Sequence, residues 1–175
     1  MRRITLLLAT MTFALAVAGG VAFAATITCV GLPATCDGGP GHDRIEGSNI
    51  DDNINGLSGN DTIDGNAGSD IIAGDSTLDP SVVPGNDKLD GGAGADRITG
   101  TGGSDTLVGG PDGDLIDANA LETDGSVDTI RAGSGTDEVW SYDGRKDIIS
   151  CGTGSDVADV DAGLDKVSKD CEVVI

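Results

Sequence analysis

Residues 56–73 read GLSGNDTID-GNAGSDIIA, which is one nine-residue pattern written twice. Each copy has Gly first, Gly fourth, Asp sixth and an aliphatic residue eighth. With some irregular copies, the pattern accounts for residues 38–168 in thirteen repeats. Asp holds the sixth position in all of them. A fixed period of this length predicts a solenoid, in which identical units stack on one another.

Each repeat divides into a turn and a short strand. Its first half is rich in glycine, which tolerates positive φ angles, so it predicts a turn. The last three positions, such as Thr62, Ile63 and Asp64, predict a strand whose middle side chain points inward. Two repeats would then close one coil, and stacked coils would form two parallel sheets. The predicted core is Ile45, Ile54, Ile63, Ile72, Leu89, Ile98, Leu107, Ile116, Ile130, Val139, Ile149 and Val167, with Ala158 as its weakest member.

The pattern resembles G-G-x-G-x-D-x-U-x, the RTX or haemolysin-type calcium-binding nonapeptide repeat. The resemblance covers about 130 of the 175 residues. It implies an all-β fold, a right-handed parallel β-roll (a β-solenoid) with two repeats per coil, and several bound calcium ions. The sixth-position carboxylates are the expected metal ligands: Asp43, Asp52, Asp61, Asp70, Asp87, Asp96, Asp105, Asp114, Asp128, Asp137, Asp147, Asp156 and Asp165.

The chemistry of these positions also favours calcium. Calcium takes six to eight oxygen ligands in a loose geometry, whereas magnesium demands a tighter octahedron and keeps its water. His42 is the only histidine, so imidazole-bound metals are not expected. Asp and Gly also suit the turns of metal-free solenoids, but rows of close carboxylates would repel one another without a cation. Glycines in these turns are expected to bring main-chain carbonyls to the ions: Gly38, Gly41, Gly56, Gly59, Gly65, Gly68, Gly91 and Gly94.

Alternate repeats should place their carboxylates on the same edge of the roll, one sheet spacing apart. The odd repeats give a first column: Asp43, Asp61, Asp87, Asp105, Asp128, Asp147 and Asp165. The even repeats give a second column: Asp52, Asp70, Asp96, Asp114, Asp137 and Asp156. All three insertions fall in odd repeats, so the first column should be interrupted and the second regular. Loops gathered on that edge are either a binding surface or, more simply, neutral insertions. Two such columns allow at most about eleven ions held between successive turns.

Composition sets the energetic problem that this chain must solve. It has 29 glycines, 2% aromatic residues and a formal net charge of −20, a balance that usually indicates disorder. One buried aliphatic side chain per repeat contributes about 1.5–3 kcal/mol. Ordering the nine residues of a repeat costs about 1–2 kcal/mol per residue in backbone entropy. We therefore expect calcium binding and folding to be coupled. The same charge argues against nucleic acid as a partner.

Residues 1–24 are expected to be a signal peptide rather than part of the fold. Arg2 and Arg3 precede an apolar stretch, and Ala22, Phe23 and Ala24 fit a cleavage site. The alternative is a membrane anchor, because the apolar stretch is long enough to span a bilayer. Cleavage after Ala24 would change the formal net charge from −20 to −22, and the mature, extracellular chain would not insert into a membrane.

Four cysteines flank the repeats, in a lead-in at residues 25–37 and around a C-terminal cap at 169–175. In an exported chain they predict two disulfides rather than free thiols. The stacked repeats would measure roughly 30 Å, and a disulfide needs Cα atoms within about 7 Å, so the two ends cannot be joined. The expected pairs are Cys29–Cys36 and Cys151–Cys171.

No catalytic constellation is evident. One histidine and four terminal cysteines give no Ser-His-Asp or Cys-His set, and repeated carboxylates fit metal ligation better than a glycosidase pair. The leading interpretation is a secreted, non-enzymatic bacterial calcium-binding protein. The alternative is a surface adhesive or structural module that calcium only stiffens, with a cell-envelope or polysaccharide partner that the sequence does not identify. An ice-binding solenoid would need a threonine ladder, which position seven lacks.

Overall fold

A computed structural model describes residues 24–30, 35–75, 84–119 and 126–175. These residues form sixteen β-strands and no α-helix. The predicted signal peptide and the bodies of the first two insertions lie outside the described residues. Within the described part, no helix is long and apolar enough to cross a membrane.

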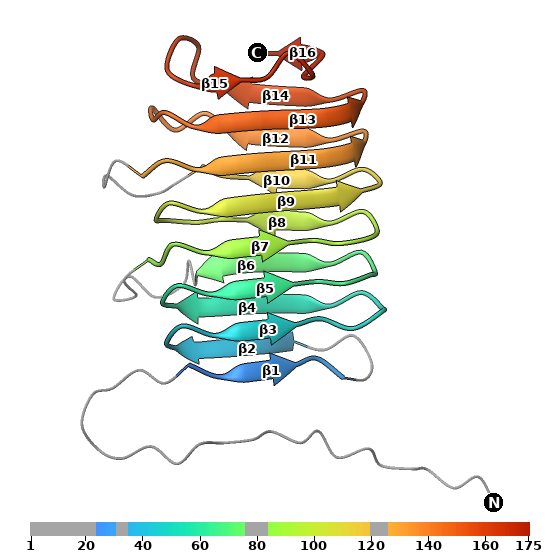
Figure 1. The fold of residues 1–175 in the computed structure, drawn as a ribbon, viewed down its shortest axis with the longest axis vertical. Coiled ribbons are helices and arrows are strands. Elements are labelled where there is room, and N and C mark those ends of the chain that lie inside the picture. Colours follow the sequence, from blue (N-terminus) through green and yellow to red (C-terminus); the bar gives the residue numbers. More distant parts are fainter. Residues whose placement is uncertain (1–23, 31–34, 76–83, 120–125) are drawn as a thin grey trace, which may run out of the picture.

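The strands alternate between two parallel eight-stranded sheets that face each other along the length of the molecule (Figure 1). The first sheet contains β1 (Thr26–Thr28), β3 (Arg44–Glu46), β5 (Thr62–Asp64), β7 (Lys88–Asp90), β9 (Thr106–Pro111), β11 (Thr129–Gly135), β13 (Ile148–Gly154) and β15 (Lys166–Val167). The second contains β2 (Thr35–Pro40), β4 (Asn53–Ser58), β6 (Ile71–Asp75), β8 (Arg97–Thr99), β10 (Leu115–Asp117), β12 (Glu138–Ser141), β14 (Val157–Val160) and β16 (Val173–Val174).

Each strand pairs with the strand two places along the chain, so one coil takes two repeats. The register aligns equivalent positions: Ile63 lies opposite Ile45 on one side and Leu89 on the other. The insertion that precedes Leu89 therefore does not shift the register. The all-β parallel β-roll expected from the sequence is confirmed, with about seven turns.

The core is a single file of eighth-position side chains between the sheets. Eleven of the twelve predicted core residues are at most 1% exposed, and Val167, in the last coil, is partly buried against them. Ala158 is also fully buried. The core is thin because each coil contributes only two such side chains, which agrees with the small number of aromatic residues.

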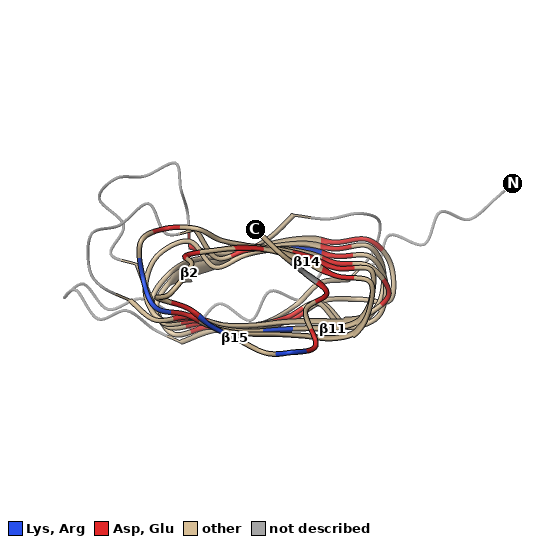
Figure 2. Ribbon diagram, turned by 90° about the horizontal axis from the view of Figure 1, so that it is seen from above, with Lys and Arg blue, Asp and Glu red and all other residues tan. Residues whose placement is uncertain are grey.

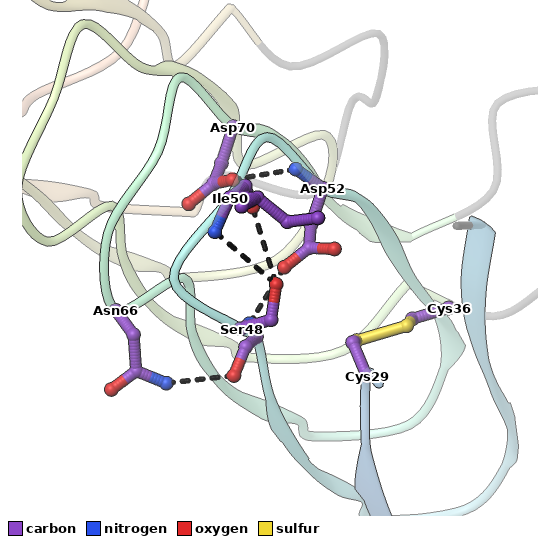
Figure 3. The surroundings of a disulfide bond; sticks show 8 residues. Cys29, Cys36, Ser48, Ile50, Asp52, Asn66 and Asp70 are labelled. Atoms are coloured by element: carbon purple, nitrogen blue, oxygen red, sulfur yellow. Dashed lines mark hydrogen bonds between the residues drawn. A yellow bond between two sulfur atoms is a disulfide. The ribbon is translucent and has the colours of Figure 1, made fainter. Parts of the chain in front are cut away.

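Both ends of the chain add strands to the sheets. Strands β1 and β2 pair with β3 and β4, so the lead-in forms a coil of its own in which Cys36 takes the position opposite Ile54. Strand β16 pairs with β14. Disulfides join Cys29 to Cys36 (Figure 3) and Cys151 to Cys171, with Cα–Cα distances of 6.0 and 5.0 Å. Both predicted pairings are confirmed.

Glycine at position four is required for two reasons. Gly59, Gly68 and Gly94 have φ angles of 111°, 132° and 127°, in the left-handed region. A Cβ atom at Gly94 would also overlap the carbonyl oxygen of Gly68 in the preceding coil. Position two is left-handed as well, even where it is not glycine: Leu57 has φ 83° and Asn66 has φ 68°. The repeat pattern did not predict this second left-handed residue.

We predict that Gly94→Ala lowers the free energy of unfolding by about 1–3 kcal/mol or more, because the new methyl group strains the turn and pushes two coils apart. Gly39→Ala is the matched control. Its Cβ would meet nothing closer than 3.5 Å, at Asp43 Oδ2. Urea unfolding under identical ionic conditions measures both. Equal losses in the two variants would contradict the close coil contact.

Candidate metal sites

The sixth-position carboxylates lie just before the strands, in two stacks at opposite ends of the flattened cross-section (Figure 2). The first column precedes strands of the first sheet, and the second column precedes strands of the second. Twelve of the thirteen predicted Asp side chains are buried, each at most 4% exposed. Asp165, in the last coil, is half-buried. The structure therefore gathers the predicted ligands into two buried rows.

One oxygen of each carboxylate binds the backbone of the preceding coil. The Asp52 N–H donates to Asp70 Oδ1 at 2.7 Å (Figure 3), and the Asp96 N–H donates to Asp114 Oδ1 at 2.9 Å. The same bond recurs down both columns. The insertions do not break it, since the Asp61 N–H reaches Asp87 Oδ1 at 2.8 Å across 26 residues. Our expectation that insertions interrupt the first column is wrong for this ladder, because the Asp that follows each insertion still accepts the amide of the preceding Asp in the column.

The second oxygen behaves differently. In eight repeats Oδ2 is buried and has no hydrogen-bond partner: Asp61, Asp70, Asp87, Asp96, Asp105, Asp114, Asp137 and Asp156. A buried carboxylate oxygen with no donor normally costs about 1–3 kcal/mol or more, so eight in one small domain require an explanation. All eight occupy the same place in the repeat. The explanation must therefore lie in the repeat itself.

In four other repeats the second oxygen is satisfied locally. The Gly39 and Ser48 N–H groups, at position two, each donate to Oδ2 of their own Asp at 2.6 Å, for Asp43 and Asp52 respectively. Ser141 Oγ donates to Asp147 Oδ2 at 2.5 Å, and the Asp161 N–H donates to Asp165 Oδ2 at 2.8 Å. We call these four carboxylates closed, and the eight whose Oδ2 has no hydrogen-bond partner open. The closed carboxylates lie toward the two ends of the roll.

The backbone at position two separates most open repeats from closed ones: position two is left-handed in seven of the eight open repeats, and Asp87, whose position two is Asp75, is the exception. Where this residue is left-handed, its N–H points to the preceding ninth position: Leu57 N–H donates to Asn55 Oδ1 at 3.2 Å, and Asn66 N–H to Asp64 Oδ1 at 3.0 Å. The Asp61 and Asp70 carboxylates then lose the donor that Gly39 and Ser48 supply in the first two repeats. The left-handed position two thus leaves Oδ2 bare.

In six of the eight open repeats position one is glycine, which keeps a small space open beside the bare oxygen, whereas Ala132 and Cys151 stand there in the repeats of Asp137 and Asp156. A Cβ atom at Gly56 would overlap both Asp61 Oδ2 and the carbonyl oxygen of Gly74 in the next coil. At Gly91 the same two neighbours are Asp96 Oδ2 and the Gly109 carbonyl oxygen. Each space is therefore bordered by a carboxylate oxygen from one coil and a main-chain oxygen from the next. The Gly109 carbonyl oxygen also accepts the Gly92 N–H at 3.2 Å. A bare carboxylate oxygen beside a main-chain oxygen is a setting for a hard cation.

Electrostatics point the same way. Burial raises the pKa of Asp87 to about 8 and that of Asp105 to about 9, and neighbouring carboxylates add to both shifts. Burial likewise raises the pKa of Asp61 and Asp114 to about 7 and that of Asp70 to about 6. Backbone hydrogen bonds to Oδ1 oppose these shifts without cancelling them. The columns are short of positive charge, which protons or metal ions can provide.

Side chains alone do not complete a metal site. Among the described residues, no group of three or more His, Cys, Asp or Glu side chains is arranged to hold a metal ion. The single histidine is engaged elsewhere, since its Nδ1 accepts a hydrogen bond from the Asn60 N–H at 2.7 Å. An ion between coils would rely on one or two carboxylates together with main-chain carbonyls, as the glycine-rich turns allow.

The family model of the RTX calcium-binding nonapeptide repeat (4 copies) matches residues 46–77, 83–116 and 122–158. The chain belongs to this family. RTX repeats bind calcium, which agrees with the bare oxygens described above. No curated protein and no solved structure matches the chain.

Sequence reasoning missed two acidic residues that the fold brings into the columns. Glu172 continues the second column past its last repeat, because its Oε2 accepts the Asp156 N–H at 2.9 Å. Asp75, at position two of the repeat that begins with Gly74, is buried beside the first column. The spacing of Glu172, 16 residues after Asp156, was a usable signal. Asp75 gave none, because it stands at the start of an insertion.

We predict that the calcium-free chain gains β-structure as the pH falls. Asp has a pKa of about 3.9 when unfolded, whereas the folded values of Asp87 and Asp105 are about 8 and 9. The folded state therefore binds more protons between these limits, so its stability is present below about pH 4 and is lost as the pH rises to about 9. Far-ultraviolet circular dichroism at about pH 5.5 and 8 measures this.

Saturating calcium is the control, and it should flatten the pH dependence above about pH 6 because the ions replace the protons. Calcium-free β-structure that increases with pH would contradict the assignment.

Proposed function

We propose that this chain is an exported, non-enzymatic bacterial calcium-binding protein whose β-roll folds when calcium binds along its two edges. The observation that carries the proposal is the set of eight buried Asp Oδ2 atoms without a hydrogen-bond donor. At five of the position-one glycines in these repeats, the neighbours also include a carbonyl oxygen of the next coil. The RTX family match supplies the identity of the ion.

The thirteen sixth-position Asp residues are the proposed ligands, and the eight open ones carry most of the binding. Successive open carboxylates share the space between their coils. The second column has four such intervals between Asp70 and Asp156, and the first has two between Asp61 and Asp105. We therefore propose about six shared ions, fewer than the eleven that a uniform array would hold. The position-one glycines supply main-chain oxygens and have no side chain to fill the site.

Calcium fits this arrangement better than magnesium. The oxygens come from two coils and include carbonyls fixed by the backbone, so their geometry cannot adapt to a strict octahedron. Calcium accepts six to eight oxygens at about 2.3–2.6 Å in irregular geometry, and magnesium does not. Water completes the shell where the protein offers fewer oxygens.

Calcium also answers the energetic problem of the fold. Two carboxylates one coil apart, at about 5 Å, repel by about 3 kcal/mol at an effective dielectric constant of 20. Each ion brings two positive charges to such an interval and binds only when the coils are stacked. Ligands that bind the folded state alone stabilise it by mass action. The thin core does not provide a comparable stabilisation.

Export is the finer part of the proposal. The predicted signal peptide at residues 1–24, with cleavage after Ala24, precedes the first described strand. Two disulfides suit an oxidising compartment. Calcium outside cells is abundant enough for sites with dissociation constants of about 0.1–1 mM. The protein would then unfold, or stay unfolded, where calcium is scarce.

A non-enzymatic role is supported by the way the eight open carboxylates are held. Their Oδ2 atoms are inaccessible between coils, so a substrate could not reach them without separating the stack. Catalytic carboxylates need such access. A structural or adhesive role at the cell surface is compatible with the same calcium sites, but it requires a partner such as a cell-envelope component or polysaccharide.

We predict a cooperative gain of β-structure when calcium is added to the chelated, disulfide-bonded mature chain, with a midpoint at about 0.1–1 mM. Circular dichroism follows the folding, and titration calorimetry counts the ions. Magnesium at the same concentration is the control and should have much less effect. A spectrum that does not change between chelator and calcium would refute coupled folding.

A second prediction concerns the middle of the second column. Asp96→Asn keeps the Oδ1 acceptor for the Asp70 N–H but removes the charge, so it should lower the calcium count by one or two ions per chain. Asp37→Asn is the charge-matched control, because Asp37 is exposed and outside both columns. Calorimetry compares the two counts. The same loss in both variants would show that net charge, and not the column, governs binding.

A further inference from the structure

Asp75 is a buried carboxylate that the nonapeptide pattern does not include. It ends strand β6, at position two of its repeat, where other copies have residues such as Leu57 or Asn66. Its side chain is only 3% exposed. Burying a charge to this extent is costly unless something compensates it.

Only one of its two oxygens is accounted for. Asp75 Oδ2 accepts hydrogen bonds from the Gly85 N–H at 3.0 Å and from Thr101 Oγ1 at 3.3 Å. The Asp75 N–H donates to Thr101 Oγ1 at 3.1 Å, so this side chain is tied to the next coil. Asp75 Oδ1 is buried without any hydrogen-bond partner. It is the same kind of bare oxygen as those of the columns.

The bare oxygen lies on the edge of the first column. A Cβ atom at Gly74, the residue next to Asp75, would overlap Asp87 Oδ2 and also approach the Gly100 carbonyl oxygen at 2.8 Å. The Asp75 charge raises the pKa of Asp61, Asp87 and Asp105, which places it within electrostatic reach of all three open carboxylates of this column. No comparable extra acidic residue is buried beside the second column in the described residues.

We propose that Asp75 is an additional calcium ligand, and that with Asp87 it forms a two-carboxylate site at the centre of the first column. Each ordinary interval would offer one open carboxylate from each of its two coils together with main-chain oxygens. Asp75 adds a further acidic side chain, from the same repeat as Asp87, which raises the ligand charge. Sites with more ligand charge bind calcium more tightly, so this one should fill first. This inference rests on the proposed function.

The alternative is that Asp75 only braces the coil at the point where the insertion leaves it. The bonds from Gly85 and Thr101 are consistent with a brace, since they join residues on both sides of residues 76–83. A brace uses Oδ2 alone, and an Asn side chain would serve equally well. It does not account for the negative charge or for the bare Oδ1.

The test compares Asp75→Asn and Asp75→Ala with wild type and with the charge-matched control Asp37→Asn. The Asn variant keeps an acceptor for the Gly85 N–H but loses the charge. Calcium calorimetry at neutral pH should show that both Asp75 variants lose one ion or bind the tightest class roughly tenfold more weakly. In chelator, Asp75→Asn should be at least as ordered as wild type, because one repulsive charge is gone.

Other outcomes separate the alternatives. An Asn variant that binds calcium like wild type, in number and affinity, would overturn the site, and an accompanying loss of stability in the Ala variant would identify a brace. If the Ala variant does not fold, the Asn variant decides alone. A wild-type chain that takes up no calcium would overturn the proposed function and this site together. Calcium uptake by wild type with an unaffected Asn variant overturns this site only.

Discussion

The structure depends on buried carboxylates that stack between coils, eight of them with one oxygen that has no hydrogen-bond partner. Every coil must present an Asp to its neighbour, because the backbone N–H of the preceding Asp has no other acceptor. The same geometry brings like charges within one strand spacing of each other. At each step of the column, hydrogen bonding therefore favours the stacking of two coils, whereas charge repulsion between their carboxylates opposes it. A cation bound between the coils would offset this repulsion.

The two edges of the roll share one ladder but differ in how much of it is open. In the second column the bare oxygens run without a gap from Asp70 to Asp156. In the first column they stop at Asp105, and Ser141, which replaces the position-one glycine, closes Asp147 with its hydroxyl. At Asp147 the Ser141 hydroxyl therefore binds the oxygen that is bare in the open repeats. The sites are consequently not equivalent, although the repeat pattern suggests that they are.

Periodicity was sufficient to predict the fold, the core and both disulfides. Ile45 and Ile116 are buried because position eight always points inward, and a stack of this length keeps Cys36 far from Cys151. Periodicity could not predict which carboxylates are open. In seven of the eight open repeats that property accompanies a left-handed φ angle at position two, which Leu57 has although leucine rarely adopts it. It also could not find Asp75, since that role arises from contacts across coils and not from spacing.

The hydrogen bonds from Asp N–H groups to carboxylates all run toward the carboxyl terminus. This shared direction implies an order in which the coils are completed. Twelve of the thirteen Asp amides donate to a carboxylate 16 to 26 residues further along the chain, and none donates to one behind it. For a chain that emerges amino terminus first, a coil cannot satisfy its own Asp amides until its successor has arrived. The last coil formed therefore always has Asp N–H groups without their carboxylate acceptors. Completion then falls to the carboxyl-terminal residues, where Glu172 and the Cys151–Cys171 disulfide close the final coil.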